Sequence, residues 1–555
     1  MFLFVFCLSA LWLVAQSPEW QWANQAGGTG LDYGKGISTD SSGNSYVTGY
    51  FAGTATFGTT TLTSSGSGDI FIAKLGTYGN YLWAKQAGGT SNDYGKGIAT
   101  DTNGNSYVSG SFTGTATFGT LTLASSSGGR ANFIVKIDSA GNYQWAKQAG
   151  GNGTVDGIDI STDSSGNSYV TGIFYGNASY GTATFGTITL TSINGSYDIF
   201  VAKLDTYGNY LWAKQAGGDD FDTGLGIATD SSGNSYVTGI FNSFGTFGST
   251  TLSSNSGDIF ITKLDINGNF LWAKHAGNTG YGFINDIASD SSGNSYVTGY
   301  FGGTLTLGST TLTSSESIDI FVAKLDTNGN FLWVKQAGGT SADEGKGIGT
   351  DSSGNSYVTG NISGIATFGN TILSCSGLSG EIFVTRLDTN GNWLWAVKAG
   401  GVSYDDGNSI AIDSSGNSYV TGYFSDIAII GTTTLTCSGW YDIFVAKLSS
   451  STMVSDEFGV PQPIFSLGQN HPNPFTNSTS FELEVSDAKS VYEVSVYDLR
   501  GRHICTLHQG LLPAGKQTFT WNGKDAADNE LSSGVYFYRV SNGINSQVKK
   551  MIFIR

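Results

Sequence analysis

One ten-residue motif recurs seven times along the 555-residue chain, and it limits the fold to a repeat architecture. The motif is D-x-x-G-N-S-Y-V-[TS]-G, and successive copies start 61, 62, 67, 60, 61 and 62 residues apart. The copies begin at Asp40, Asp101, Asp163, Asp230, Asp290, Asp351 and Asp413. Because one short repeat cannot bury its own apolar face, neighbouring repeats must pack together to form a core.

Two further motifs repeat with the same period. A tryptophan motif, W-A-K-Q-A-G-G or a close variant, starts at Trp22, Trp83, Trp145, Trp212, Trp272, Trp333 and Trp395. A third motif, similar to D-I-F-V-A-K-L, starts at Asp69, Asn132, Asp198, Asp258, Asp319, Glu381 and Asp442. Three motifs therefore agree on seven repeat units.

Each repeat unit is predicted to contain four β-strands, as examples from two units show. Gly97–Thr100 and Ser106–Phe112 are the first two strands of one unit, and Asp319–Leu325 and Phe331–Gln336 are the last two of another. The D-S-S-G-N and D-T-N-G-N segments between strands indicate tight hairpin turns, since Asp, Asn and Gly favour such turns. A calcium loop usually offers several carboxylates, whereas each of these segments has one, so the hairpin turn is favoured over a calcium site.

The two ends of the repeat region complement each other. The region starts with a tryptophan strand at Trp22 and ends after Asp442–Leu448 without one. An open array would need polar caps, whereas a closed ring can complete its last sheet with the first strand. We therefore expect an all-β fold, a seven-bladed β-propeller of four-stranded blades over residues 18–448. Glu19–Ala26 should close the blade that contains Asp413–Leu448.

The repeat units resemble those of secreted bacterial seven-bladed β-propeller repeat (SBBP-type) proteins. The resemblance rests on the S-G-N-S-Y-V-T-G and D-I-F-V-A-K-L-D-x-x-G-N signatures and covers Glu19–Leu448. It implies the propeller fold and an extracellular setting, and it does not imply one activity.

The N-terminus predicts export. Phe2–Val14 is an apolar run of about 13 residues, too short to span a bilayer, and small residues follow at Ala15 and Ser17. Residues 1–17 are therefore expected to be a signal peptide, and no membrane span is expected elsewhere. The net charge of −17 disfavours nucleic acid as a partner, because like charges repel.

Chemistry-bearing residues are scarce, and no catalytic residue, metal ligand or cofactor is predicted. Only four histidines are present, and His275, the single one among the repeats, replaces a glutamine found in other units. The carboxylates clustered at Asp219–Asp222 leave a polysaccharide-acting enzyme as a weak alternative. Cys375 and Cys437 occupy equivalent positions in neighbouring units, and their pairing stays open.

Candidate ligand residues lie where the units differ, in the connections expected on one face. A five-residue insertion carries Tyr175 and Tyr180, which are candidates for exposed stacking on a ligand. An acidic residue recurs ten residues after the tryptophan, and it could form a ring that binds a cation or polar ligand, at Asp32, Asp93, Asp222, Asp343 and Asp405. In three units a lysine follows three residues later, at Lys35, Lys96 and Lys346. The favoured alternative is a loop-capping aspartate, and the repeated tryptophans are expected to pack between blades.

The composition changes after Leu448, where a polar linker over residues 449–463 precedes a predicted small Ig-like β-sandwich over 464–555. The last segment resembles the C-terminal sorting domain of the bacterial type IX secretion system. The matching positions include Asn473, Pro474, Phe475, Gly501, Gly515, Gly534, Tyr536, Lys549 and Lys550. The resemblance implies that the secretion machinery is a partner and that the protein reaches the cell surface or the medium.

Taken together, these features predict an exported, non-catalytic binding module for a glycan or a surface protein. A structural or adhesive surface protein without a discrete ligand is the main alternative.

Overall fold

The computed structural model describes ten segments of the chain, and their regular structure consists of β-strands alone. The segments are residues 18–126, 129–176, 181–254, 257–278, 280–375, 379–450, 465–485, 491–499, 502–541 and 546–555. The predicted signal peptide and most of the predicted linker lie outside these segments. The chain divides into two compact parts, one holding strands β1 to β40 and the other β41 to β47.

The first part contains seven repeat units, each with four antiparallel strands. We number these strands one to four, starting at the common centre around which the units are arranged. The first strands are β2 (Tyr33–Thr39), β8 (Tyr94–Thr100), β14 (Gly153–Thr162), β20 (Thr223–Thr229), β26 (Tyr281–Ser289), β30 (Glu344–Thr350) and β36 (Asp405–Ile412). The second strands are β3 (Ser45–Phe51), β9 (Ser106–Thr113), β15 (Ser168–Gly176), β21 (Ser235–Phe241), β27 (Ser295–Leu307), β31 (Ser356–Ile362) and β37 (Ser418–Phe424).

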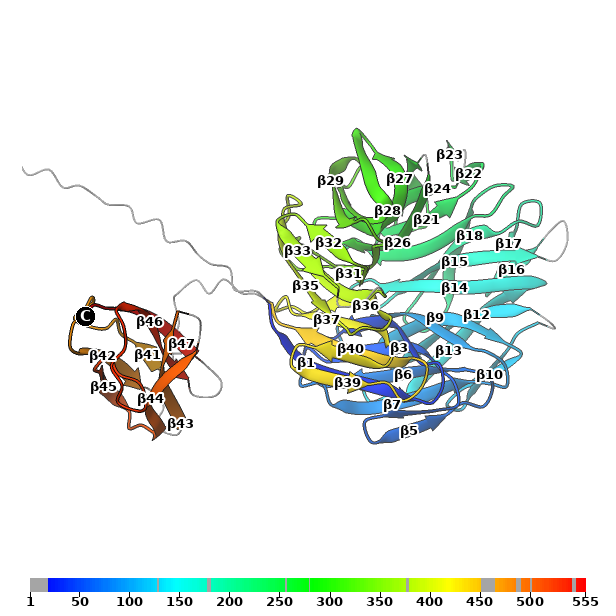
Figure 1. Cartoon of the computed structure of the whole chain (residues 1–555). Coiled ribbons are helices and arrows are strands. Elements are labelled where there is room, and N and C mark those ends of the chain that lie inside the picture. The colour runs from blue at the N-terminus through cyan, green and yellow to red at the C-terminus, as the bar shows by residue number, and fades with distance from the viewer. Residues whose placement is uncertain are drawn as a thin grey trace, which may run out of the picture. The chain divides into compact units, whose positions relative to one another are not determined.

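The third and fourth strands complete each unit. The third strands are β6 (Asp69–Leu75), β12 (Arg130–Ile137), β18 (Asp198–Leu204), β24 (Asp258–Leu264), β28 (Thr310–Leu325), β34 (Glu381–Leu387) and β40 (Asp442–Leu448). The fourth strands are β7 (Tyr81–Gly88), β13 (Tyr143–Gly151), β19 (Tyr210–Ala216), β25 (Phe270–Asn278), β29 (Phe331–Gly339), β35 (Trp393–Ala399) and β1 (Trp20–Gly28). Figure 1 shows the units following one another around a common centre.

Strand β1, from the start of the repeat region, pairs with β40 at its end (Figure 1). Trp22 lies opposite Lys447, just as Trp83 of β7 lies opposite Lys74 of β6. Each first strand also contacts the first strand of the next unit, and β36 contacts β2. The succession of contacts therefore returns to its start.

The connection between strands two and three is a β-hairpin in every unit, where the sequence analysis expected only a loop of variable length. The separate hairpin strands are β4 (Thr54–Phe57), β5 (Thr60–Thr63), β10 (Thr115–Phe118), β11 (Leu121–Ala124), β16 (Thr182–Phe185), β17 (Ile188–Thr191), β22 (Phe244–Phe247), β23 (Thr250–Ser253), β32 (Ile365–Phe368), β33 (Thr371–Ser374), β38 (Ile427–Ile430) and β39 (Thr433–Thr436). In the fifth unit the hairpin is continuous with β27 and β28. Each hairpin bonds to the fourth strand of the preceding unit and so fastens two units together.

The hairpin-turn interpretation of the D-S-S-G-N segments is confirmed. The Asp40 carboxylate accepts hydrogen bonds from the backbone N–H groups of Ser42 and Asn44, both at 3.0 Å. Gly43 has a φ of 77°, which an L-residue adopts only with strain. The carboxylate also accepts a bond from the buried Tyr46 hydroxyl at 3.1 Å. The aspartate thus ties the turn to the core.

The repeated tryptophans pack between units, as predicted. The Trp22 indole N–H donates to the Thr77 carbonyl at 3.0 Å, and Thr77 lies in the turn of the next unit. The edge of the Trp22 ring faces Tyr419, with the ring centroids 6.1 Å apart. Equivalent tryptophan–tyrosine contacts recur around the molecule.

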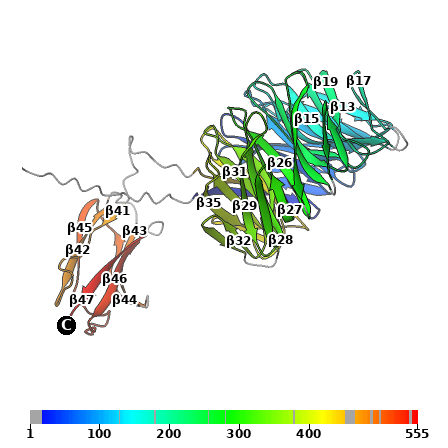
Figure 2. The same ribbon diagram turned by 90° about the horizontal axis from the view of Figure 1, so that it is seen from above.

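The C-terminal part is a sandwich of two antiparallel sheets, visible in Figure 2. One sheet has the order β41 (Phe465–Leu467), β42 (Thr479–Val485) and β45 (Gly515–Trp521). The other has the order β44 (His503–Leu511), β43 (Val491–Asp498), β46 (Gly534–Ser541) and β47 (Ser546–Phe553). A common core around Trp521, Tyr492 and Tyr538 joins the sheets.

The residues of the predicted sorting motif support this sandwich. Asn473 accepts a 2.8 Å hydrogen bond from the Ile552 N–H, and the buried Phe475 ring packs on Trp521 and Phe553. Tyr536 is buried beside Trp521. Pro474 lies between Asn473 and Phe475, Gly515 and Gly534 begin β45 and β46, and Lys549 and Lys550 lie on β47, whereas Gly501 falls outside the described residues.

Candidate functional site

Every first strand has a β-bulge at the same place, and the extra residue has no partner on the second strand. In the first unit the register shifts between Gly34 and Gly36, so Lys35 is left out of the ladder. A bulge re-aims its unpaired residue, here into the space enclosed by the first strands. The bulge residues are Lys35, Lys96, Ile158, Leu225, Asn285, Lys346 and Asn408.

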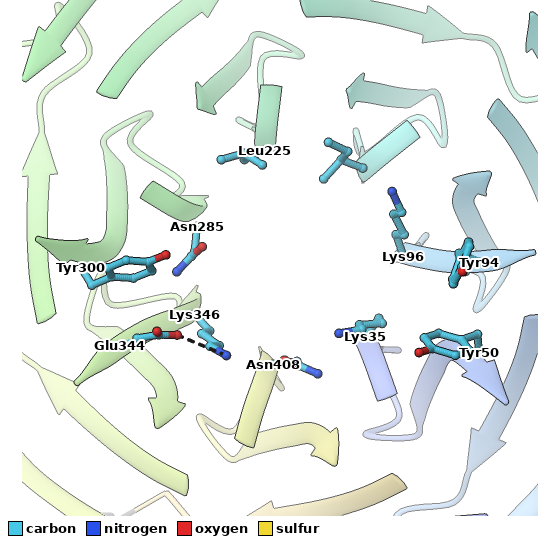
Figure 3. A pocket seen from close by; sticks show the side chains of 12 residues that line it. Lys35, Tyr50, Tyr94, Lys96, Leu225, Asn285, Tyr300, Glu344, Lys346 and Asn408 are labelled. Carbon is cyan, nitrogen blue, oxygen red and sulfur yellow. Dashed lines mark ion pairs between the residues drawn. The ribbon is translucent and has the colours of Figure 1, made fainter. Parts of the chain in front are cut away.

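The seven bulge residues line a cavity of about 490 Å³ at the mouth of the central channel. Gly95, Glu344 and three tyrosines, Tyr50, Tyr94 and Tyr300, complete its wall. Figure 3 shows Asn408 between Lys346 and Lys35, with Leu225 on the opposite side of the opening. The cavity therefore has a cationic side and an apolar side, which Ile158 and Leu225 form.

Two of the three lysines are neutralised by acids of the next unit. Lys96 lies 2.7 Å from the carboxylate of Asp156, and Lys346 forms an ion pair with Asp406. Both acids stand two residues before the bulge residue of their unit. Lys346 also lies 3.3 Å from Glu344 of its own strand.

Lys35 has no such acid. The corresponding position of the next unit is Tyr94, and among the described residues no ion pair reaches the Lys35 ammonium. Its closest aromatic neighbours are the rings of Tyr33 and Tyr423, with centroids 5.2 and 5.7 Å away. Such rings stabilise a cation less than a carboxylate does, so the charge of Lys35 is less well compensated than the charges of Lys96 and Lys346.

The pKa values reflect this difference. Burial lowers the pKa of Lys35 to about 8, and the nearby charges of Lys346 and Lys96 add to the effect against the attraction of Asp406. Burial also acts on Lys346, but Asp406, Tyr404 and Glu344 together outweigh it and raise the pKa of Lys346 above the ordinary lysine value. Lys35 is thus a cation held where its charge is poorly solvated.

Tyrosines from three units surround Lys35. Tyr33 stacks on Tyr50 at a centroid distance of 5.0 Å and meets the edge of Tyr423 at 4.6 Å. The Tyr94 ring lies edge-on to Tyr50 at 5.0 Å, and Tyr441 contacts Tyr33 at 5.4 Å. The cluster gives one side of the mouth flat apolar surfaces with hydroxyl groups.

A second level of the channel lies just inside the bulge residues, with a volume of about 140 Å³. Asp159 and Asp286 line it, and each accepts a 2.9 Å hydrogen bond from a backbone N–H of a following unit, from Ile227 and Ile348 respectively. Burial raises the pKa of Asp159 to about 6 and raises that of Asp286 well above its usual value. Both carboxylates therefore tie units together.

The five aspartates predicted as a ring are fully buried, four of them just before a first strand and Asp405 at the start of β36. Each accepts two backbone hydrogen bonds; for Asp343 the donors are Gly339 at 2.8 Å and Ser363 at 3.0 Å. Burial raises the pKa of Asp343 to about 7. The same arrangement occurs at Asp32, Asp93, Asp222 and Asp405, and it matches the loop-capping alternative.

Tyr175 lies beside a second cavity of about 340 Å³, together with Arg130, Asp156 and Tyr197. Its ring centroid is 3.9 Å from that of Tyr197, which in turn lies 4.8 Å from Phe221. Arg130 pairs with Asp156 at 3.2 Å and covers Tyr94 of the first cavity. Tyr180, the other candidate of the insertion, lies outside the described residues.

Other candidate groups are accounted for. His275 lies 3.4 Å from Asp258, as Gln86 lies near Asp69, so the substitution preserves the local pairing. Cys375, Cys437 and Cys505 are free. Among the described residues no three His, Cys, Asp or Glu side chains gather as a metal site, and no helix is long and apolar enough to cross a membrane.

The sequence analysis noted Lys35, Lys96 and Lys346 but named as ligand candidates the aspartates three residues earlier, for which it favoured a loop-capping role. The structure brings the lysines together at one cavity, whose lining includes none of the five aspartates. A signal was present, because glycines flank all three lysines and glycine is common at bulges.

Each of the two parts of the chain matches a known sequence family. The family described as β-propeller repeat matches residues 21–50, 82–114, 144–172, 211–239, 332–365 and 394–423. The family described as FlgD Ig-like domain matches residues 471–546. The protein is therefore an all-β chain with β-propeller repeats and an Ig-like domain.

Individual proteins resemble the chain more distantly. An uncharacterized WD repeat-containing protein, L264, of Acanthamoeba polyphaga mimivirus is 26% identical over 505 residues, which cover 74% of this chain and 36% of that protein. A copper-bound fungal alcohol oxidase is 11% identical with a TM-score of 0.36, covering 97% of this chain and 100% of that one. PorZ, a surface component of the type IX secretion system of Porphyromonas gingivalis, is 11% identical with a TM-score of 0.16, covering 96% and 100%. At such scores neither structural likeness carries an argument.

Proposed function

We propose that the chain is an exported, non-catalytic binding protein whose ligand enters the mouth of the central channel. In this proposal the seven repeat units are the blades of a β-propeller, which β1 closes by pairing with β40. One observation carries the proposal: the units repeat closely, yet their bulge residues differ and converge on one cavity of about 490 Å³. Cavities of this size commonly hold small ligands or the end of a larger one.

The carboxylates of the channel favour binding over catalysis. Acid–base cleavage of a glycan needs two carboxyl groups, and Asp159 and Asp286 are the two that line the inner level of the channel. Both accept backbone hydrogen bonds that join neighbouring units, so a structural role accounts for them. Release of reducing sugars from polysaccharides by the purified protein would instead support an enzyme.

We also propose that the Ig-like part is the address for type IX secretion, on the strength of the motifs from Asn473 to Lys550. The proposal predicts that a reporter fused to residues 464–555 and supplied with a signal peptide crosses the outer membrane of a bacterium with that system. A Phe475→Ala fusion, which loses a buried ring of the sandwich, should stay in the periplasm.

The binding function is tested with the chain from Pro18 to Arg555 on an array of neutral and acidic glycans and surface proteins. Binding that a double substitution at Asn408 and Leu225 abolishes would place the ligand at the channel mouth. Binding to none of the probes would favour a structural or adhesive role without a discrete ligand.

A further inference from the structure

We infer that the channel mouth binds an acidic oligosaccharide and that Lys35 holds a sugar carboxylate. This inference rests on the proposed binding function and names the class of ligand. It starts from the arrangement of charge, because Lys96 and Lys346 are paired with acids and Lys35 is not. Lys35 is therefore the one channel lysine without an ion pair among the described residues, so it is the lysine most open to a ligand carboxylate.

The walls around Lys35 suit a sugar ring. Tyr50 and Tyr94 line the cavity on the side of Lys35, and Tyr33 stacks on Tyr50. A pyranose ring presents apolar C–H faces and polar edges, and tyrosine matches both with an apolar face and a hydroxyl group. Further round the same cavity, Ile158 and Leu225 add an apolar surface. Asn285 and Asn408 add polar groups at the same level.

A longer oligosaccharide could extend from the channel mouth toward the second cavity, which Tyr175 lines. Arg130 covers the ring of Tyr94 in the first cavity and lines the second cavity with Tyr175 and Tyr197. Asp156, which also lines the second cavity, pairs with Lys96 of the first, so residues of the two cavities contact each other. The rings of Tyr175, Tyr197 and the exposed Phe221 form an aromatic strip. Such a strip suits successive sugar rings.

An acidic peptide fits these features less well. Asp156, Glu344 and Asp406 stand among the lysines, and the whole chain has a net charge of −17. A run of adjacent carboxylates would meet these acids and be repelled. An oligosaccharide with one carboxylate per ring spaces its charges further apart and contributes the apolar faces that the tyrosines accept.

The test uses two polymers that share one backbone. Polygalacturonate carries a carboxylate on each ring, and its fully methyl-esterified form carries none. Binding to the chain from Pro18 to Arg555 is measured by calorimetry, with Lys35→Met as the variant and Lys85→Met as the control. Lys85 lies on the fourth strand of the same unit, outside the cavity. Thermal unfolding verifies that each variant is folded.

We expect the acidic polymer to bind at least tenfold more tightly than the ester, and Lys35→Met to remove that difference while Lys85→Met keeps it. Equal binding of both polymers, unaffected by Lys35→Met, would overturn the inference and leave the binding function standing. Poly-glutamate is titrated in the same way. If it bound as tightly as polygalacturonate or more tightly, the inference would be overturned in favour of a peptide ligand. No binding of any glycan or protein would remove both proposals.

Discussion

The Lys96 ammonium lies 2.7 Å from the carboxylate of Asp156, which belongs to the next repeat unit around the channel. Lys346 and Asp406 have the same relationship. Where Lys35 would find its acid, the chain has Tyr94. One position of the neighbouring unit therefore decides whether a channel lysine is paired with an acid.

A carboxylate at position 94 should weaken the binding of an acidic ligand. In Tyr94→Asp the new acid pairs with Lys35, as Asp156 pairs with Lys96, and raises the pKa of Lys35 toward its ordinary value. Calorimetry should show at least a tenfold loss of affinity for polygalacturonate. Tyr94→Phe keeps the ring and adds no charge, so it should bind within about threefold of the wild type. Unchanged affinity in Tyr94→Asp would contradict the role given to Lys35.

Affinity for an acidic ligand should fall at alkaline pH. The pKa of Lys35 is about 8, since burial disfavours its charged form. Below pH 8 the lysine is charged and attracts a carboxylate, and above pH 8 it loses that charge. Titrations between pH 6 and 9.5 should show weaker binding above pH 8, and Lys35→Met should flatten the profile. A wild-type profile that stays flat would mean that another group binds the anion.

The stability of the repeat region should increase when the pH is lowered from 8 to 5. Burial raises the pKa of Asp32, Asp222, Asp343 and Asp405 to about 7 in the folded state, against 3.8 as the ordinary value. Their stabilising contribution is fully present below 3.8 and is lost as the pH rises through 7, because the folded state binds the extra protons.

The turn aspartates act in the opposite direction at lower pH. Although burial works against them, hydrogen bonds from local groups lower the pKa of Asp205 and Asp388, so their stabilisation is lost as the pH falls below 3.8. Thermal unfolding should therefore show a maximum near pH 4–5, with a gain of ~1 kcal/mol or more over pH 8. A maximum at pH 7–8 would show that the buried carboxyls ionise normally.

Loss of a loop-capping aspartate should affect stability and leave ligand affinity unchanged. Asp343→Ala leaves the N–H groups of Gly339 and Ser363 without their acceptor, at a cost of about 1–3 kcal/mol. Asp343→Asn keeps one acceptor oxygen and should cost less. Denaturant unfolding measures the first effect, and calorimetry with polygalacturonate measures the second. A variant of normal stability that no longer binds would return these aspartates to the ligand site.

The contact between units at Gly97 should not tolerate a methyl group. A Cβ at this position would lie 2.8 Å from the Asp159 carboxylate and 2.9 Å from the backbone nitrogen of Ile160. Gly97→Ala should therefore destabilise the fold by about 1–3 kcal/mol, as overpacked cores do. Gly277→Ala is the control, because a Cβ there meets no atom within 4 Å. Equal unfolding midpoints for the two variants would contradict this packing.

The repeated motifs predicted the strands and turns well because these depend on residues close in sequence. Asp40, Gly43 and Asn44 form their turn without help from distant segments. The hairpins between strands two and three were missed. Their alternation is visible, since Ala55 and Phe57 are buried and Thr54 and Thr56 are exposed. However, they lie in the stretch where length varies, and this favoured a loop interpretation.

The candidate site was harder to predict from the sequence. A bulge depends on the register between two strands, so nothing in β2 alone shows that Lys35 leaves the ladder. The comparison of Lys35 with Tyr94 requires knowing that adjacent units bring these positions together. The sequence spacing of Asp32 and Lys35 linked two residues that the structure separates, one under a connection and one in the channel.

The pairing of β1 with β40 copies the register of β6 with β7, including the shift beside Lys447. In the other units a five-residue turn such as Gly76–Asn80 joins these strands, so the seventh pair differs mainly in lacking that covalent link. The two strands can therefore separate without any change in a connecting turn. Joining Leu448 to Trp20 through such a turn, with new termini opened elsewhere, should give a circular permutant with the same register and a relocated seam.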